Sequence, residues 1–187
     1  MIFTYDELKT NVGRYSDIQK EILTGKLIPL RRGLYETDVN ASVKYLAAKF
    51  YNPSYISLDY VLSAYSLIPE AVYSITSATS NNSKIYNNAF GCFIYSHIPK
   101  SVFSLGIKEE VEGGCSYLIA TPEKAMCDKL YSFPVVSNLS ELTALLFDDL
   151  RIDEEELLNL NKDDLLRFAK LYRSKNLNLF AEFINKK

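Results

Sequence analysis

The sequence predicts a mixed α/β protein, and three observations support this fold class. Residues 1–38 combine two short helical patterns with a basic hairpin pattern. Residues 42–133 mix helical and strand patterns, which is typical of an α/β core. Residues 137–187 carry stripes of leucine at helical spacing and predict helices only. We therefore expect an N-terminal domain over 1–38 and a second domain over 39–187, made of the α/β core and the helical tail.

The composition is that of an ordinary globular protein, with 48% hydrophobic and 24% charged residues among 187. No run of apolar residues is long enough to span a membrane, and the N-terminus lacks a signal-peptide pattern. We therefore expect a cytoplasmic protein that does not bind membranes. Cys92, Cys115 and Cys127 show no metal-ligand spacing and His97 is the single histidine, so we expect reduced thiols, no metal site and no cofactor.

Two short helices are predicted near the N-terminus. Thr4 and Glu7 have the spacing of a capping box, in which each side chain bonds the other residue's backbone amide at a helix start. After a glycine-containing turn, Ser16 and Gln19 have the same spacing and predict the start of the second helix. Gly25 stands where a glycine often ends a helix. Two helices around a short turn fit a helix-turn-helix motif.

A hairpin with two arginines follows these helices. The segment 26–36 places two short apolar strands around Arg31, Arg32 and Gly33. Helix, turn, helix and basic hairpin is the order of a winged helix-turn-helix, which inserts its second helix into the major groove of DNA and touches DNA with its hairpin, the wing. The candidate DNA-binding residues are Arg14, Tyr15, Ser16, Gln19 and Lys20 on the second helix, with Lys26, Arg31 and Arg32 on the wing.

The chemistry of these side chains suits DNA to different degrees. Gln19 can read an adenine edge, whereas arginine suits guanine or phosphate. Ser16 is either a DNA contact or only a helix cap. Two other interpretations of the segment stay open: a helical subdomain with solvated arginines, and a winged helix that binds protein.

The second domain is predicted to open with two helices, at 42–51 and 57–66, whose N-caps are Ser42 and Ser57. Runs of β-branched and aromatic residues between turn signals predict the strands that follow. These strands are expected at 71–79, 84–88, 90–97, 107–111 and 116–120.

A further helix has an unusually clear start. Thr121 is a good N-cap, and Pro122 occupies the first helical position, where proline is favoured. Lys124 and Asp128 lie one turn apart, and as an exposed pair they would contribute about 0.5 kcal/mol. Helices of the tail are expected to begin near Ser137, Asp153, Asn161 and Ser174.

The order of several motifs resembles the AbiEi family of antitoxins from type IV (AbiE) toxin–antitoxin systems. Together the motifs span most of residues 4–131, and their order is more specific than any one of them. They are Gly25–Tyr35, Tyr51–Leu58, Leu67–Glu70, Val72–Thr76 with Thr79, and Ala120–Ala125 with Asp128, Leu130 and Tyr131.

The resemblance implies a bacterial antitoxin and transcriptional regulator that is not an enzyme. In this family an N-terminal winged helix binds inverted repeats in double-stranded promoter DNA and represses its own operon. A C-terminal domain is needed to counteract a nucleotidyltransferase toxin. The DNA-binding role then falls on the second helix and the wing, and the segments Pro53–Ser57 and Thr121–Lys124 look like joints of the second domain's core. The family's DNA-contact positions match Arg14, Lys20, Lys26, Arg31 and Arg32.

Three alternatives are weighed against this function. The chain is shorter at its C-terminus than many family members, which leaves a solitary regulator without antitoxin activity open. Residues 1–60 hold eight basic and seven acidic residues, which keeps a protein-interaction module open. A metal-dependent nuclease needs converging carboxylates. Glu109, Glu110 and Glu112 are clustered, but they lie at a predicted hairpin tip, where solvated charge is the usual role.

Overall fold

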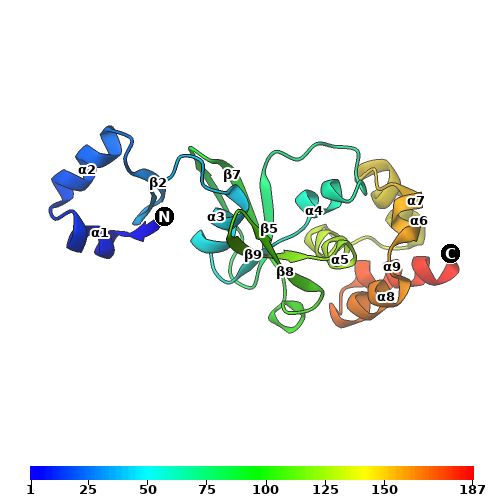
Figure 1. Cartoon of the computed structure of the whole chain (residues 1–187). Helices are drawn as coiled ribbons and strands as arrows, with labels where there is room; N and C mark the ends of the chain where they lie inside the picture. Colours follow the sequence, from blue (N-terminus) through cyan, green and yellow to red (C-terminus); the bar gives the residue numbers. More distant parts are fainter.

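The computed structural model describes residues 1–187 and shows a mixed α/β fold with nine α-helices and two β-sheets (Figure 1). Strands β1, β3 and β2 form a three-stranded sheet, and the other strands form a six-stranded sheet in the order β6-β7-β5-β4-β9-β8. In chain order the elements are β1 (Ile2–Thr4), α1 (Tyr5–Asn11), α2 (Tyr15–Leu23), β2 (Ile28–Arg31), β3 (Leu34–Glu36), α3 (Val43–Phe50), β4 (Ser54–Ile56), α4 (Asp59–Ala64), β5 (Ile75–Thr79), β6 (Lys84–Asn88), β7 (Gly91–His97), η1 (Lys100–Val102), β8 (Ile107–Glu112), β9 (Cys115–Ala120), α5 (Pro122–Ser132), α6 (Leu139–Ala144), η2 (Leu145–Asp149), α7 (Glu154–Asn159), α8 (Lys162–Leu171) and α9 (Lys175–Lys186).

Residues 1–38, which we call the N-terminal module, lie at one end of the molecule in Figure 1, and helices α6 to α9 lie at the other end. In the module, the capping box of Thr4 and Glu7 is confirmed at the start of α1. The predicted hairpin is confirmed as β2 and β3. The sequence did not indicate β1, which pairs antiparallel with β3, because three residues are too short to show an alternating pattern.

The second predicted capping box is wrong. Helix α2 begins at Tyr15 and its N-cap is Arg14, whose backbone is extended and whose carbonyl accepts from the Ile18 amide at 3.2 Å. Ser16 therefore lies inside the first turn, where its hydroxyl does not cap the helix. The end of α2 is as predicted, since Gly25 has a positive φ of 75° and follows the C-cap.

The large sheet corrects the prediction at β4. Ser57 is not an N-cap, because α4 begins at Asp59 after Leu58, and the preceding segment forms a strand that the sequence analysis did not predict. Strand β4 is antiparallel to β5 and parallel to β9, so it lies inside the sheet. The strand predicted at 71–79 is shorter, since β5 begins at Ile75 and Tyr73 is 94% exposed.

The remaining predicted elements are close to those observed. The antiparallel pairs β6–β7 and β8–β9 are confirmed. Thr121 caps α5 by accepting from the Lys124 amide, and Pro122 is its first residue. Asp153 and Asn161 cap α7 and α8, whereas the side chain of Ser174 makes no capping bond at α9.

Two hydrophobic cores hold this arrangement together. The large core joins 37 buried residues, most of them from the six-stranded sheet, from helices α3, α4 and α5 and from the tail helices. The small core joins Leu8, Ile18, Leu27 and Tyr35 in the module. The hairpin β2–β3 serves both cores, because its residues Leu30 and Leu34 belong to the large one.

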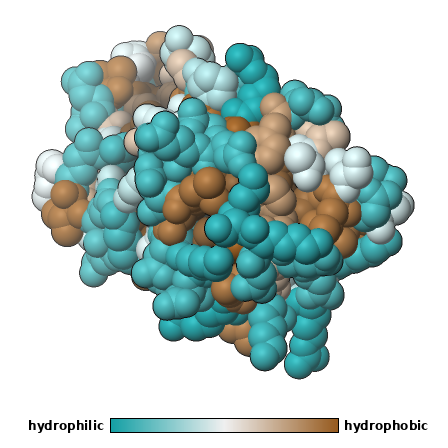
Figure 2. Space-filling model, turned by 90° about the vertical axis from the view of Figure 1, so that its right-hand side faces the viewer, coloured by the Kyte–Doolittle hydropathy of each residue, from teal (hydrophilic) through white to brown (hydrophobic).

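The face viewed from the C-terminal helices is mainly hydrophilic, with separate hydrophobic patches (Figure 2). Leu158 and Leu171 are among the exposed large hydrophobic residues of these helices. None of the nine helices combines the length and apolar character that a membrane crossing requires.

Candidate nucleic-acid interface

Helix α2 is amphipathic and presents one face to solvent. Ile18 points into the small core and is fully buried. Ser16, Lys20 and Leu23 lie on the opposite side of the helix and are exposed, with Leu23 86% exposed. Tyr15 is 60% exposed and Gln19 is half-buried on the flank. The face that the sequence assigned to DNA is therefore free of protein contacts along most of its length.

Tyr5 links the hairpin turn to the start of α2. Its amide donates to the carbonyl of Gly33 at 3.0 Å, and its ring lies 6.4 Å from the ring of Tyr15, centroid to centroid. Gly33 has a φ of 78°, which suits glycine in a tight hairpin turn. The turn that carries Arg32 and the helix start that carries Arg14 consequently lie at the same end of the module.

The basic side chains at this end are available to a ligand. Arg14 and Arg32 are exposed, and neither forms an ion pair. Lys20 pairs with Asp17 at 3.3 Å, but both side chains are exposed and such a pair contributes little. A phosphate could displace Asp17 from Lys20 at small cost.

Two predicted DNA-binding residues are placed differently. Lys26 is exposed but follows the C-terminal end of α2, and this nine-residue helix, about 14 Å long, separates it from Arg14. Arg31 turns toward the second domain, where its Nε donates to the carbonyl of Phe50 at 2.9 Å. The structure thus brings Arg14, Tyr15 and Arg32 to one end of the module and does not bring Lys26 there.

A polar cluster lies buried in the second domain and corrects the prediction of an exposed ion pair. Lys124 and Asp128 are both fully buried, and Lys124 Nζ lies 2.8 Å from Asp128 Oδ1. Ser57 and Tyr55 donate to Asp128 Oδ2 at 2.7 and 3.0 Å. Tyr172, on the tail after α8, donates to Asp128 and accepts from Lys124. We call these five residues the buried polar cluster.

Burial governs the protonation of this cluster. Burial lowers the pKa of the Lys124 ammonium, and the Asp128 charge opposes that shift. Burial also raises the pKa of the Tyr55 and Tyr172 hydroxyls, and the neighbouring Asp128 charge raises them further. Both tyrosines therefore remain hydrogen-bond donors to Asp128 at neutral pH. The cluster joins β4, α5 and the tail, and all five of its side chains are buried.

The segments Pro53–Ser57 and Thr121–Lys124, which the sequence marked as joints of the core, meet in this cluster. One signal in the sequence pointed to the burial of the ion pair. Lys124 and Asp128 enclose the apolar run Ala125, Met126 and Cys127, and all three of these side chains are buried.

The carboxylates that a nuclease would need do not converge. Glu110 lies 2.8 Å from Lys108 on the same strand, β8, and Glu112 lies 3.0 Å from Lys44 of α3, so each of these two carboxylates is engaged in an ion pair. All three cysteines are free thiols. His97 is exposed, and its Nδ1 lies 2.9 Å from the carbonyl of Asn81.

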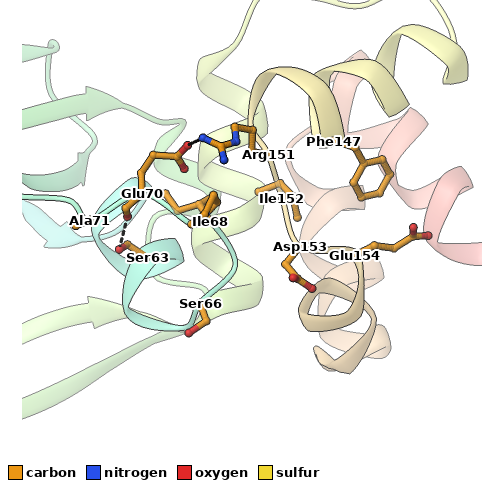
Figure 3. A pocket seen from close by; sticks show the side chains of 11 residues that line it. Ser63, Ser66, Ile68, Glu70, Ala71, Phe147, Arg151, Ile152, Asp153 and Glu154 are labelled. Atoms are coloured by element: carbon orange, nitrogen blue, oxygen red, sulfur yellow. Dashed lines mark hydrogen bonds and ion pairs between the residues drawn. The ribbon is translucent and has the colours of Figure 1, made fainter.

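The largest pocket, of about 780 Å³, lies between the loop after α4 and the start of α7 (Figure 3). Its charged side chains are already paired. Arg151 donates to Glu70 at 2.7 Å, Glu154 accepts from Lys187, and Asp153 caps α7. Figure 3 shows Arg151 turned to Glu70 rather than into the pocket. The pocket therefore offers no unpaired charge to a ligand.

Comparison with protein-family models and with curated proteins finds no match to this chain.

Proposed function

We propose that this chain is a DNA-binding transcriptional regulator whose N-terminal module is a winged helix-turn-helix. The observation that carries the proposal is the placement of Arg14, Tyr15 and Arg32 at one end of the module, exposed and linked through Tyr5. A winged helix uses the start of its second helix and its hairpin turn in the same way, for the major groove and the adjoining backbone. In this assignment Gln19 and Ser16 face base edges, and Lys20 and Lys26 face phosphates.

The resemblance to AbiEi antitoxins extends the proposal to a biological role. The chain would repress its own operon at inverted repeats, and the second domain would counteract a nucleotidyltransferase toxin encoded beside it. It would act by binding rather than by catalysis, in the cytoplasm.

The test is binding of the purified chain to the DNA upstream of its own gene across a salt series, with scrambled DNA as competitor. Specific binding is expected to weaken steeply with salt, because arginine–phosphate contacts release counterions. Arg14→Ala is expected to lower the affinity by roughly tenfold and to reduce the salt slope by about 0.9. Lys170→Ala, an exposed change on α8, serves as the control and should bind as the wild type does. Equal, weak binding to both DNAs would reject the regulator.

A second candidate, a protein-interaction module, is favoured by one observation. Leu23 is large, apolar and 86% exposed on the outer side of α2, where a DNA-reading helix usually carries polar groups, and Tyr15 is 60% exposed at the start of the helix. Leu23→Ser separates the two functions. A partner-binding module should lose its partner, whereas DNA binding should change less than twofold.

A further inference from the structure

The β2–β3 hairpin is fastened to the second domain beside its turn. The pairing of the two strands shifts register between Pro29 and Arg31, which makes Leu30 the extra residue of a β-bulge. Leu30 is buried in the large core, and its carbonyl accepts from Asn88 Nδ2 at 3.1 Å. The bulge therefore turns Leu30 inward and places the next residue, Arg31, against the second domain.

Arg31 bonds both parts of the chain. Its Nε donates to the carbonyl of Phe50, the last residue of α3, at 2.9 Å. Carbonyls at a helix C-terminus lack a partner within the helix and carry the negative end of its dipole, so a guanidinium is favoured there. Its Nη1 donates to the carbonyl of Arg32 at 3.4 Å. One guanidinium thus joins α3 to the hairpin turn.

We propose that Arg31 is a positioning residue that holds the turn in place, and that Arg32 makes the DNA contact. The inference rests on the proposed function, because it divides two arginines of the DNA-binding set into different roles. Arg31 and Arg32 are both exposed, but the Arg32 side chain makes no hydrogen bond and can meet a phosphate as it stands. Arg31 would have to release the Phe50 carbonyl to do so. Fixing the turn lowers the conformational entropy that Arg32 loses on binding.

A double-mutant cycle with Arg31→Ala and Arg32→Ala on the full chain tests this division of roles. Arg32→Ala is expected to lower DNA affinity by roughly tenfold and to reduce the salt slope by about 0.9, since one phosphate contact is lost. Arg31→Ala is expected to lower DNA affinity about three- to fivefold with an unchanged salt slope, because a smaller fraction of molecules has the turn in its binding-competent conformation. The double variant should match Arg32→Ala alone, since Arg31 acts through Arg32.

The opposite pattern would overturn the proposal. If each single variant reduces the salt slope and their losses add in the double variant, Arg31 is itself a phosphate contact.

Amide hydrogen exchange gives a measurement that does not depend on DNA. In Arg31→Ala the amides of Gly33 and Leu34 are expected to exchange at least about fivefold faster, whereas those of α2 keep their wild-type rates. Arg32→Ala is the matched control and should leave all these rates unchanged. If the Gly33 and Leu34 amides of Arg31→Ala exchanged at wild-type rates, the positioning role of Arg31 would be rejected. If the wild-type chain binds no DNA, the proposed function fails, while this measurement still decides whether Arg31 holds the turn.

Arg31→Lys keeps the positive charge and removes the planar guanidinium that reaches two carbonyls. It is expected to show the fast exchange of Arg31→Ala and weaker DNA binding at an unchanged salt slope. Wild-type exchange together with wild-type affinity in this variant would overturn the positioning role.

Discussion

In the N-terminal module, Arg14 and Arg32 extend into solvent without a partner, whereas Lys124 of the second domain is fully buried against Asp128. The module has four residues in its own core, and the second domain contributes most of a core of 37. Basic side chains therefore have different roles in the two regions: they are free to bind a ligand in the module and support the fold in the second domain. Solvent access and the presence of an internal partner, rather than the charge itself, distinguish a residue that can bind a ligand from one that supports the fold.

The largest effect is expected where the second domain loses a partner of its buried charge. Asp128→Ala leaves Lys124 buried without its carboxylate and should lower the free energy of unfolding by about 3–5 kcal/mol. Urea denaturation followed by circular dichroism measures this change. The matched control is Lys186→Ala, which breaks the exposed Lys186–Glu182 pair of the same i,i+4 spacing.

The control variant should lower the free energy of unfolding by about 0.5 kcal/mol or less, because exposed ion pairs contribute little to stability. If the two variants lost equal stability, burial would not be the reason for the importance of the Lys124–Asp128 pair.

A smaller and local effect is expected in the module. Ile18→Ala removes a fully buried side chain from a core of four residues and should destabilise the module by about 2–4 kcal/mol. Most of the large core does not involve the module. The amides of β5 and α5 should therefore remain protected from hydrogen exchange, whereas the amides of α1 and α2 should lose their protection. Loss of protection throughout the chain would show that the two regions unfold as one unit.

The smallest effect concerns pH at the start of α1. Hydrogen bonds from the backbone amide and then the hydroxyl of Thr4 lower the pKa of Glu7 below its ordinary value of 4.5. The folded state favours the carboxylate, so this stabilisation is complete above pH 4.5 and is lost as the pH falls through the lowered pKa.

Glu7→Gln keeps a capping side chain but does not titrate. Protection of the α1 amides should therefore fall less in this variant than in the wild type between pH 5 and about 3. An identical acid dependence in the two proteins would exclude Glu7 as its source.

Local signals predicted much of the fold because their partners lie within a few residues. The Thr4–Glu7 box, the Gly25 helix end, the Thr121 cap and the two hairpins of the large sheet all depend on neighbours along the chain. Ser57 has the same local pattern as a cap, but its hydroxyl bonds Asp128, which lies 71 residues away. A sequence pattern cannot show such a distant competitor.

The same difference between local and distant partners explains which residues of the candidate site could be predicted. The predicted second helix and hairpin made Arg14, Arg31 and Arg32 candidate DNA contacts, and all three are exposed in the structure. Nothing near Arg31 in the sequence indicated the Phe50 carbonyl, and the bulge at Leu30 that directs the side chain there leaves no sequence mark.

The sharing of the β2–β3 hairpin between two cores has a consequence for the modular exchange of this chain, in evolution or in engineering. A fragment cut after residue 38 would carry Leu30 and Leu34 into water, since their packing partners lie in the second domain. A recombination event that moves the N-terminal module to another protein must therefore also supply a surface for these two leucines. The N-terminal module is therefore expected to be transferred only together with a domain that covers Leu30 and Leu34, so its sequence evolves together with that of the second domain.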